Sequence, residues 1–154
     1  MNVIRTANRE DTFSLEQLVK VMIGDQNKDD VARGIVHDFF ANLQFTIFAC
    51  EEDTQVKGFA VLKQGSFEGA NGVAEIVWLG IAQKYKRQGL GTLLVHYVEQ
   101  YATENGIRKL YIKTNSSTKD AVCFWIMQDY EFEARLLDFG WEGHDDYLLG
   151  KNMR

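Results

Sequence analysis

Two hydrophobic spacings alternate along the chain and predict helices and strands. Apolar residues recur at helical spacing within residues 15–23, 31–43 and 90–101, which gives each segment one apolar face. A fourth helix is predicted at residues 119–128, after the capping candidates Ser117 and Thr118. Runs rich in β-branched and aromatic residues predict seven strands, at residues 2–7, 44–50, 56–64, 73–81, 109–113, 130–137 and 147–153. The predicted order of elements is therefore βααβββαβαββ.

Polar segments indicate where these elements begin and how they connect. Ser14 and Gln17 have the spacing of a capping box, which predicts that the first helix begins there. Residues 24–30 form a polar break between the first two helices, and residues 65–72 form a glycine-containing connection. Because the third helix joins two strands, these two strands are expected to lie parallel, after an antiparallel meander of three strands.

One stretch combines a buried strand, a basic glycine loop and a helix start. Residues 73–82 are nearly all apolar, as is typical of a strand covered on both faces. Glycine at positions 89 and 91 lets a phosphate approach the backbone, where the first amides of the next helix have no intrahelical partner. The helix dipole adds partial positive charge. Three cations of the loop add full charges: Lys84, Lys86 and Arg87. We therefore expect an anion site here.

Two well-known phosphate motifs do not match this loop. A Walker loop ends in Gly-Lys-Ser/Thr, where this chain has Gly91-Thr92-Leu93, and a dinucleotide fingerprint needs a small residue where Leu94 stands. The segment Lys86-Arg87-Gln88-Gly89-Leu90-Gly91 resembles the acetyl-CoA signature Gln/Arg-x-x-Gly-x-Gly/Ala of the GNAT superfamily of N-acetyltransferases, with lysine in the first slot. Just before it, Leu79-Gly80-Ile81 is similar to the Leu-x-Val strand end of that family.

The resemblance implies a fold, an acyl donor and a set of cofactor-binding residues. The implied fold is the α/β (α+β) GNAT fold, a mixed seven-stranded sheet flanked by four helices, in one domain over residues 1–154. Acetyl-CoA is implied as the donor and CoA as the co-product. Residues 114–125 are similar to the family's Asn-x-x-Ala-x-x-Phe/Leu-Tyr helix, which flanks the thiol arm of CoA. The implied cofactor-binding residues are Leu79, Gly80, Ile81, Lys86, Arg87, Gln88, Gly89, Leu90, Gly91, Thr92, Asn115, Thr118, Ala121 and Phe124.

Two departures from this second motif affect the chemistry. Thr118 stands in the asparagine slot, and Trp125 stands in the tyrosine slot. The family's tyrosine often protonates the leaving thiolate, whereas an indole N–H is a donor but no acid at neutral pH. Tyr85 and Tyr130 are the nearest tyrosines, and packing is the simpler role for both. A thiol with a pKa of about 8.5 is also a tolerable leaving group without an enzyme acid.

Glu75 is the candidate general base. It is the only charged residue within residues 73–82, and a carboxyl group buried among apolar residues acquires the raised pKa that a base needs near neutrality. Such a base matters because a lysine-like amine has a pKa of about 10.4 and costs roughly 4–5 kcal/mol to deprotonate at pH 7. The string Ala74-Glu75-Ile76-Val77 resembles the segment holding the glutamate base in the histone acetyltransferase branch of the superfamily. The alternative is a glutamate on a solvent-facing side of the strand.

Composition narrows the class of protein and its partners. The 154 residues are 45% hydrophobic and 25% charged, the balance of a soluble globular protein without a membrane span. The start is no signal peptide, and Cys50 and Cys123 form no Cys-x-x-Cys pair, so a cytoplasmic protein with reduced thiols is expected. The histidines His37, His96 and His144 lack ligand spacing, so no metal site is expected. A net charge of −5 argues against nucleic acid as a partner.

The acceptor is expected to be a primary amine of a small molecule or peptide that attacks in a ternary complex. Acidic residues at Asp25, Asp29, Asp30 and within residues 141–146 are either attractants for a cationic amine or solvated surface. The alternative function is a non-catalytic CoA-binding sensor or regulatory subunit, which Trp125 in the tyrosine slot favours. The sequence leaves open the identity of the amine, the acyl chain and the oligomeric state, for which a homodimer is one option.

Overall fold

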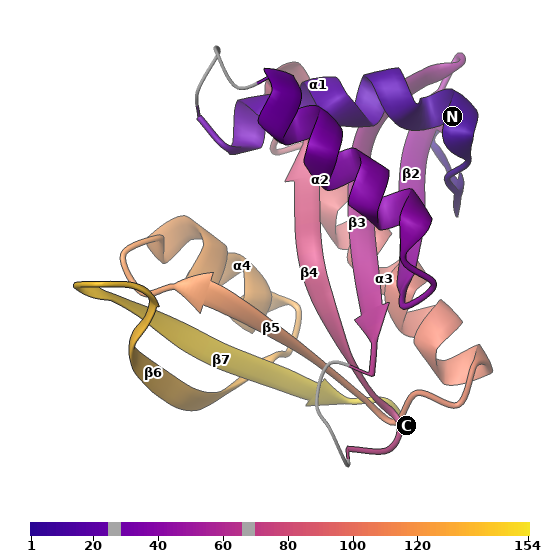
Figure 1. Ribbon diagram of the computed structural model, residues 1–154. Helices are drawn as coiled ribbons and strands as arrows, with labels where there is room; N and C mark the ends of the chain where they lie inside the picture. Colours follow the sequence, from indigo (N-terminus) through magenta and orange to yellow (C-terminus); the bar gives the residue numbers. More distant parts are fainter. Residues whose placement is uncertain (25–28, 66–69) are drawn as a thin grey trace. The chain divides into compact units, whose positions relative to one another are not determined.

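The computed structural model describes residues 1–24, 29–65 and 70–154 of the chain (Figure 1). In these residues the helices are α1 Thr12–Met22, α2 Asp29–Ala41, α3 Leu90–Glu104 and α4 Lys119–Met127, with 3₁₀ turns η1 Arg9–Asp11 and η2 Gln83–Tyr85. The strands are β1 Val3–Thr6, β2 Phe45–Glu52, β3 Gln55–Gln64, β4 Val73–Ile81, β5 Lys109–Asn115, β6 Glu131–Trp141 and β7 His144–Asn152. The predicted order βααβββαβαββ is confirmed.

The strands form one mixed sheet in the order β1-β2-β3-β4-β5-β7-β6. Strand β2 pairs antiparallel with β1 and with β3, and the β2–β3 pairing is the first step of the predicted meander. Strands β3 and β4 are neighbours in the sheet. Strands β4 and β5 are parallel, with pairs running from Val73↔Lys109 to Glu75↔Tyr111, which confirms the crossover through α3. Strand β7 pairs antiparallel with β5 and with β6. The predicted mixed sheet of seven strands is thus confirmed over the described residues.

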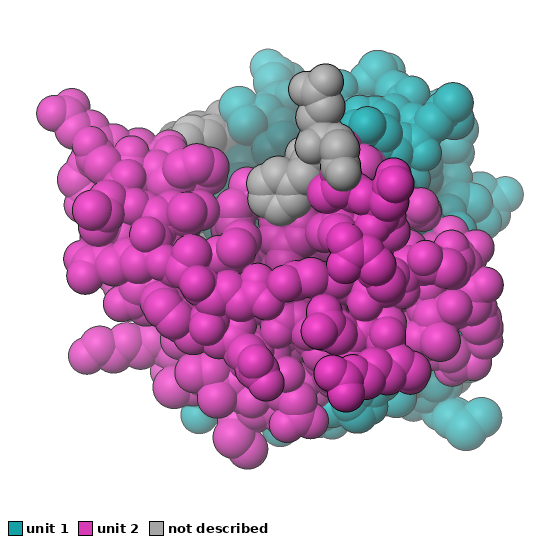
Figure 2. All heavy atoms as spheres, turned by 90° about the horizontal axis from the view of Figure 1, so that it is seen from below, with its two compact units in different colours: residues 1–63, 78–98 teal, residues 64–77, 99–154 magenta. Residues whose placement is uncertain are grey.

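The chain divides into two compact units, which Figure 2 shows in different colours. Unit 1 consists of residues 1–63 and 78–98 and holds β1, β2, most of β3, the end of β4 and most of α3. Unit 2 consists of residues 64–77 and 99–154 and holds the start of β4, then β5, α4, β6 and β7. Each unit has its own buried apolar residues.

In unit 1 the helices cover both faces of the strands. Helices α1 and α2 lie over β2 and β3 on one face, and α3 lies behind them (Figure 1). Phe39 of α2 packs against Phe59 of β3 with ring centroids 6.5 Å apart, and Phe48 of β2 packs against Tyr97 of α3 at 5.6 Å. The fully buried side chains of this core include Leu15, Val19, Val36, Phe48, Phe59, Val61, Leu62 and Leu94.

In unit 2 the core forms around the aromatic pair at the end of α4. Tyr130 is buried and packs edge-to-face against Trp125 at 5.0 Å. Lys151 of β7 lies beside them, where its ammonium pairs with the Glu99 carboxylate at 2.9 Å and donates to the Gln128 carbonyl at 3.0 Å. The fully buried side chains of this core include Leu110, Ile112 and Leu149.

The predicted start of the first helix is wrong. The capping box lies at Asn8 and Asp11, where the Asn8 side chain accepts from the Glu10 amide and the Asn8 amide donates to Asp11, both at 2.8 Å. It opens η1, which leads into α1, so Ser14 already lies inside the helix. Asn8-x-x-Asp11 offers the same reciprocal bonds as Ser14-x-x-Gln17, and asparagine is at least as strong a cap as serine.

Two predicted connections are only partly described. Of the polar break predicted at residues 24–30, residues 25–28 lie outside the described part. Asp29 already belongs to α2 and not to the connection between the helices. In residues 65–72, residues 66–69 lie outside the described part. The final hairpin is tighter than predicted, because β6 extends to Trp141 and β7 begins at His144.

We expect Asp11→Asn to lower the stability of the fold by about 1–3 kcal/mol. Arg5 of β1 donates to both Asp11 carboxylate oxygens at 2.8 Å, and Asp11 is buried. These hydrogen bonds, aided by the backbone amide of Asn8, hold the pKa of Asp11 below its ordinary value of 3.8. The stabilisation is therefore fully present above that value and is lost as the pH falls through the lowered pKa. Thermal unfolding at neutral and acid pH measures both effects.

The control is Asp53→Asn in the exposed turn between β2 and β3. Asp53 has a positive φ of 50°, a conformation that asparagine also adopts readily. The control should stay within about 0.5 kcal/mol of the parent. An equal loss of stability in both variants would contradict the role assigned to Asp11.

Candidate active site

The start of α3 is open in the way that an anion site requires. The Leu93 amide donates to the Gly89 carbonyl at 3.0 Å, so Gly89 caps the helix and the amides of Leu90 and Gly91 open it. Gly89 has a φ of 82°, in the left-handed region that favours glycine. A Cβ added there would meet no heavy atom within 4 Å, so the space beside the backbone is empty. An anion can therefore approach this helix end directly.

The basic loop before this helix is attached to β3 through Tyr85. The Tyr85 hydroxyl donates to Gln55 at 2.8 Å, and the Lys57 ammonium lies 4.5 Å from the centre of the Tyr85 ring. The Lys84 ammonium lies 4.7 Å from the same ring. The side chains of Lys86, Arg87 and Gln88 are exposed. The loop thus has a fixed base and presents its cations to solvent.

Packing explains some of the small and apolar residues in this segment. A Cβ at Gly80 would come within 2.9 Å of Phe59, and still closer to Met22, so the glycine lets α1 approach β4. The Leu90 side chain is buried in the core, which leaves its backbone amide for the anion site. Leu79, Ile81 and Thr92 are half-buried.

In unit 2, Glu75 is buried and held by two neighbours on β5. Its side chain accepts a hydrogen bond from the Tyr111 hydroxyl at 3.0 Å, and the Lys113 ammonium lies 3.5 Å from its other carboxylate oxygen. Only 8% of Glu75 is exposed, so the alternative of a solvent-facing glutamate is wrong. Tyr111 is the register partner of Glu75, and Lys113 lies two residues further along on the same face of β5. The carboxylate is therefore fixed in orientation.

The segment before α4 is organised by Asn115. Its side chain accepts from the Ser117 amide at 2.9 Å, and its carbonyl accepts from the Thr118 amide at 3.0 Å. Thr118 is the N-cap of α4 by position, but its side chain makes no capping hydrogen bond. Ala121 and Phe124 are half-buried along the helix.

The tyrosines near these segments do not have the properties of a general acid. Burial and the negative charge of Glu99 raise the pKa of Tyr130 far above its usual value of 10.0. The Tyr85 hydroxyl is bonded to Gln55. Trp125, in the tyrosine slot, is buried against Tyr130. These contacts agree with packing roles for all three side chains.

We expect Tyr130→Phe to leave kcat/KM within about twofold of the parent, because the lost hydroxyl is a very weak acid. A general acid would lose about 10²-fold or more on the same substitution. Steady-state kinetics from pH 6 to 9 measures the difference. A large fall in kcat with unchanged thermal stability would reinstate Tyr130 as the acid.

The acidic residues proposed to attract an amine are mostly paired within the protein. The Lys20 ammonium lies 2.6 Å from Asp29, and the Arg33 guanidinium lies 3.1 Å from Asp30. In the last hairpin, the backbone amide of Asp138 and the guanidinium of Arg135 hold the pKa of Asp145 below its usual value. Asp25 lies outside the described residues. For the described carboxylates, solvated and paired surface is the simpler interpretation.

The structure brings the sequence-predicted residues together in two groups. Unit 1 holds the strand end and the glycine loop, Leu79, Gly80, Ile81, Lys86, Arg87, Gln88, Gly89, Leu90, Gly91 and Thr92. Unit 2 holds Glu75 and the α4 segment, Asn115, Thr118, Ala121 and Phe124. Sequence reasoning missed Tyr111 and Lys113, although their spacing of two on a predicted strand was the signal that they share a face. Among the described residues, no three His, Cys, Asp or Glu side chains cluster to hold a metal.

The family of the chain follows from a comparison with family profiles. The profile of the Acetyltransferase (GNAT) family matches residues 13–128, which include β4, the glycine loop, α3 and α4. The chain belongs to the GNAT acetyltransferase family. No curated protein sequence matches it significantly. No helix of the described residues is long and apolar enough to cross a membrane.

Solved structures share the fold over the whole chain. A GNAT-family protein from Desulfovibrio desulfuricans superimposes with a TM-score of 0.87 at 19% identity, covering 100% of both chains. An N-acetyltransferase from Staphylococcus aureus gives a TM-score of 0.81 at 18% identity and covers 100% of this chain and 99% of its own. An aminoglycoside 6′-N-acetyltransferase complexed with coenzyme A gives 0.79 at 17% identity, covering 99% and 97%. At these low sequence identities, the comparisons establish a shared fold only.

Proposed function

We propose that this chain is an acetyl-CoA-dependent N-acetyltransferase that acts on a primary amine, with residues 1–154 serving as one catalytic domain. The observation that carries the proposal is the open start of α3 at Gly89, preceded by the exposed cations Lys86 and Arg87. The diphosphate of CoA is an anion of the kind that such a helix end binds. Acetyl-CoA, when bound, supplies the activated acyl group.

The residues of this segment fit a CoA diphosphate in shape and in charge. The amides of Leu90 and Gly91 supply donors at the helix start, and the empty space beside Gly89 admits phosphate oxygens. Lys86 and Arg87 supply compensating positive charge from exposed positions. The fixed base of the loop at Tyr85 supports these groups, because less loop freedom is lost on binding.

The proposed role of Glu75 is to accept the proton that the acceptor amine must lose. Tyr111 and Lys113 act as positioning residues, since each contacts one carboxylate oxygen and limits its rotation. A fixed base loses less entropy when the proton moves than a freely rotating one. The proton passes to the carboxylate either directly or through one water molecule.

The acceptor class is a primary amine of a small molecule or peptide. Solved relatives differ in what their names state: one is an aminoglycoside 6′-N-acetyltransferase and another a ribosomal-protein-alanine N-acetyltransferase. The net charge of −5 favours the approach of cationic amines over anionic ones.

A second candidate function is a CoA-binding sensor without catalysis. The observation in its favour is Trp125, which is buried in the slot where the family often has a tyrosine that acts as general acid. The buried Tyr130 does not replace that tyrosine. The buried carboxylate of Glu75 favours the enzyme.

A thiol-release assay over an amine panel separates the two functions. The panel contains polyamines, aminoglycosides, amino acids and peptides, and calorimetry measures CoA binding in parallel. The enzyme predicts CoA binding and amine-dependent thiol release with at least one class. CoA binding without release across the panel would favour the sensor, and absence of CoA binding would contradict both.

A further inference from the structure

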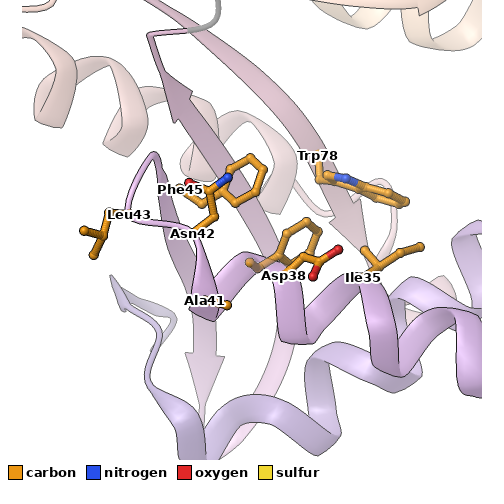
Figure 3. Close-up of a pocket in the computed structure, with 8 residues that line it drawn as sticks. Ile35, Asp38, Ala41, Asn42, Leu43, Phe45 and Trp78 are labelled. Atoms are coloured by element: carbon orange, nitrogen blue, oxygen red, sulfur yellow. The ribbon is translucent and has the colours of Figure 1, made fainter.

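A pocket of about 750 Å³ opens in unit 1 beside the last turns of α2 (Figure 3). This volume suits a small organic ligand. The pocket lies between α2, the start of β2 and the side chain of Trp78 on β4. The residues that define its chemistry are Ile35, Asp38, Phe39, Asn42, Phe45 and Trp78.

The wall of this α2 pocket is aromatic and fixed by edge-to-face contacts. The Phe39 ring lies 5.7 Å from Phe45 and 5.9 Å from Trp78, with interplanar angles of 79° and 68°. The Lys63 ammonium lies 5.9 Å from the centre of the Phe45 ring, so one ring of the wall already has a cation at contact distance. Trp78 is half-buried, and indole is the aromatic side chain that attracts cations most strongly.

Two features add negative charge at the α2 end of the pocket, whereas the Lys63 ammonium adds positive charge beside Phe45 on the other side. Asp38 lies in the last turns of α2, and Figure 3 shows its carboxylate on the side of Ile35 and Trp78. The carbonyl end of a helix carries partial negative charge, and the last turn of α2 contains no basic residue to compensate it. The nearby His37 lies 3.7 Å from Asp38 and adds positive charge only when protonated. An acidic residue at this end of a helix is unfavourable unless a cation is present.

We propose that the α2 pocket binds an organic ammonium ion with an aromatic or apolar body. The ammonium group lies near the Asp38 carboxylate and the Trp78 ring, and the body packs against Phe39 and Ile35. The carboxylate balances the charge of the ligand, and the rings supply contact area and cation–π attraction. This binding needs neither acetyl-CoA nor Glu75, so it is measured independently of the proposed acetyl transfer.

The first test compares three probes of similar shape by calorimetry, without acetyl-CoA. The probes are 2-phenylethylammonium, the neutral 2-phenylethanol and the anionic 3-phenylpropionate. The cation is expected to bind at least about tenfold more tightly than the neutral probe, and the anion more weakly still. Absence of cation binding, or equal affinity for the cation and the neutral probe, would overturn the proposal.

The second test uses two Asp→Asn variants on the same helix. Asp38→Asn removes a carboxylate whose side chain is 78% exposed. It should therefore weaken 2-phenylethylammonium binding by about two- to fivefold, without lowering Tm, because the helix end loses an unfavourable charge. Asp30→Asn is the matched control, since it makes the same charge change in the first turn of α2. The control should bind the probe like the parent. Wild-type affinity in Asp38→Asn, or equal losses in both variants, would overturn the assignment.

A third measurement determines whether the bound amine is a substrate for acetylation or a separate ligand. Acetyl-CoA is added to the complex with 2-phenylethylammonium, and mass spectrometry detects the N-acetyl product. Acetylation supports the α2 pocket as part of the acceptor site, and binding without acetylation supports a separate ligand such as an effector amine. Because binding is measured first, the first two tests remain decisive for the pocket even if the protein transfers no acetyl group.

Discussion

Glu75→Gln is expected to lower kcat/KM by about 10²-fold or more near neutral pH. The amide keeps the size of the side chain and an oxygen that accepts from Tyr111, but it takes no proton from the amine. Because an ordinary alkylamine has a pKa of about 10.4, the free amine becomes abundant in alkali and part of the activity should return there. Kinetics from pH 6 to 10 with a saturating acyl donor measures both effects.

The matched control is Glu131→Gln in unit 2, which makes the same change at an exposed position of β6. It should retain kcat/KM within about twofold, as surface substitutions usually do. If Glu75→Gln matched the parent over the whole pH range, Glu75 would have no part in proton transfer.

Gly91→Glu is expected to abolish CoA binding. Gly91 lies in the first turn of α3, where a glutamate side chain would add bulk and a negative charge next to the proposed diphosphate position. The same substitution favours the helix itself, because glutamate has a higher helix propensity than glycine and a negative charge suits a helix start. Calorimetry with CoA, together with Tm, separates lost binding from lost folding.

Gly34→Glu is the matched control for this substitution. Gly34 is an exposed glycine of α2, and a Cβ there would meet no heavy atom within 4 Å. The control adds the same charge to unit 1 and should bind CoA like the parent. Normal affinity in Gly91→Glu would remove the glycine loop from the proposed cofactor site.

Local spacing was sufficient to predict the elements of the fold. The apolar run over residues 73–82 contains no helical period, and it forms β4 as expected. The apolar face that begins at Leu90 forms α3 from that residue. The parallel pairing of β4 with β5 then followed from the handedness of the crossover, because a helix separates them in the chain. Each of these predictions uses only the local spacing of residues and the order of the elements along the chain.

Contacts between residues far apart in the chain could not be predicted from the sequence pattern. Tyr111 and Lys113 lie 36 and 38 positions after Glu75, and their contacts depend on the register of β4 and β5. The α2 pocket likewise depends on how Trp78 meets Phe39 and Asp38. The start of the first helix was missed for a different reason, since two cap motifs of similar strength compete within residues 8–17.

The most direct test of the proposed cofactor site is an NMR titration of ¹⁵N-labelled protein with CoA and with pantetheine, which lacks the diphosphate. The amide resonances of Gly89 and Gly91 should shift on addition of CoA and remain in place with pantetheine, because the helix start binds phosphate oxygens. CoA binding that leaves both glycine amides unchanged while other amides shift would contradict the account.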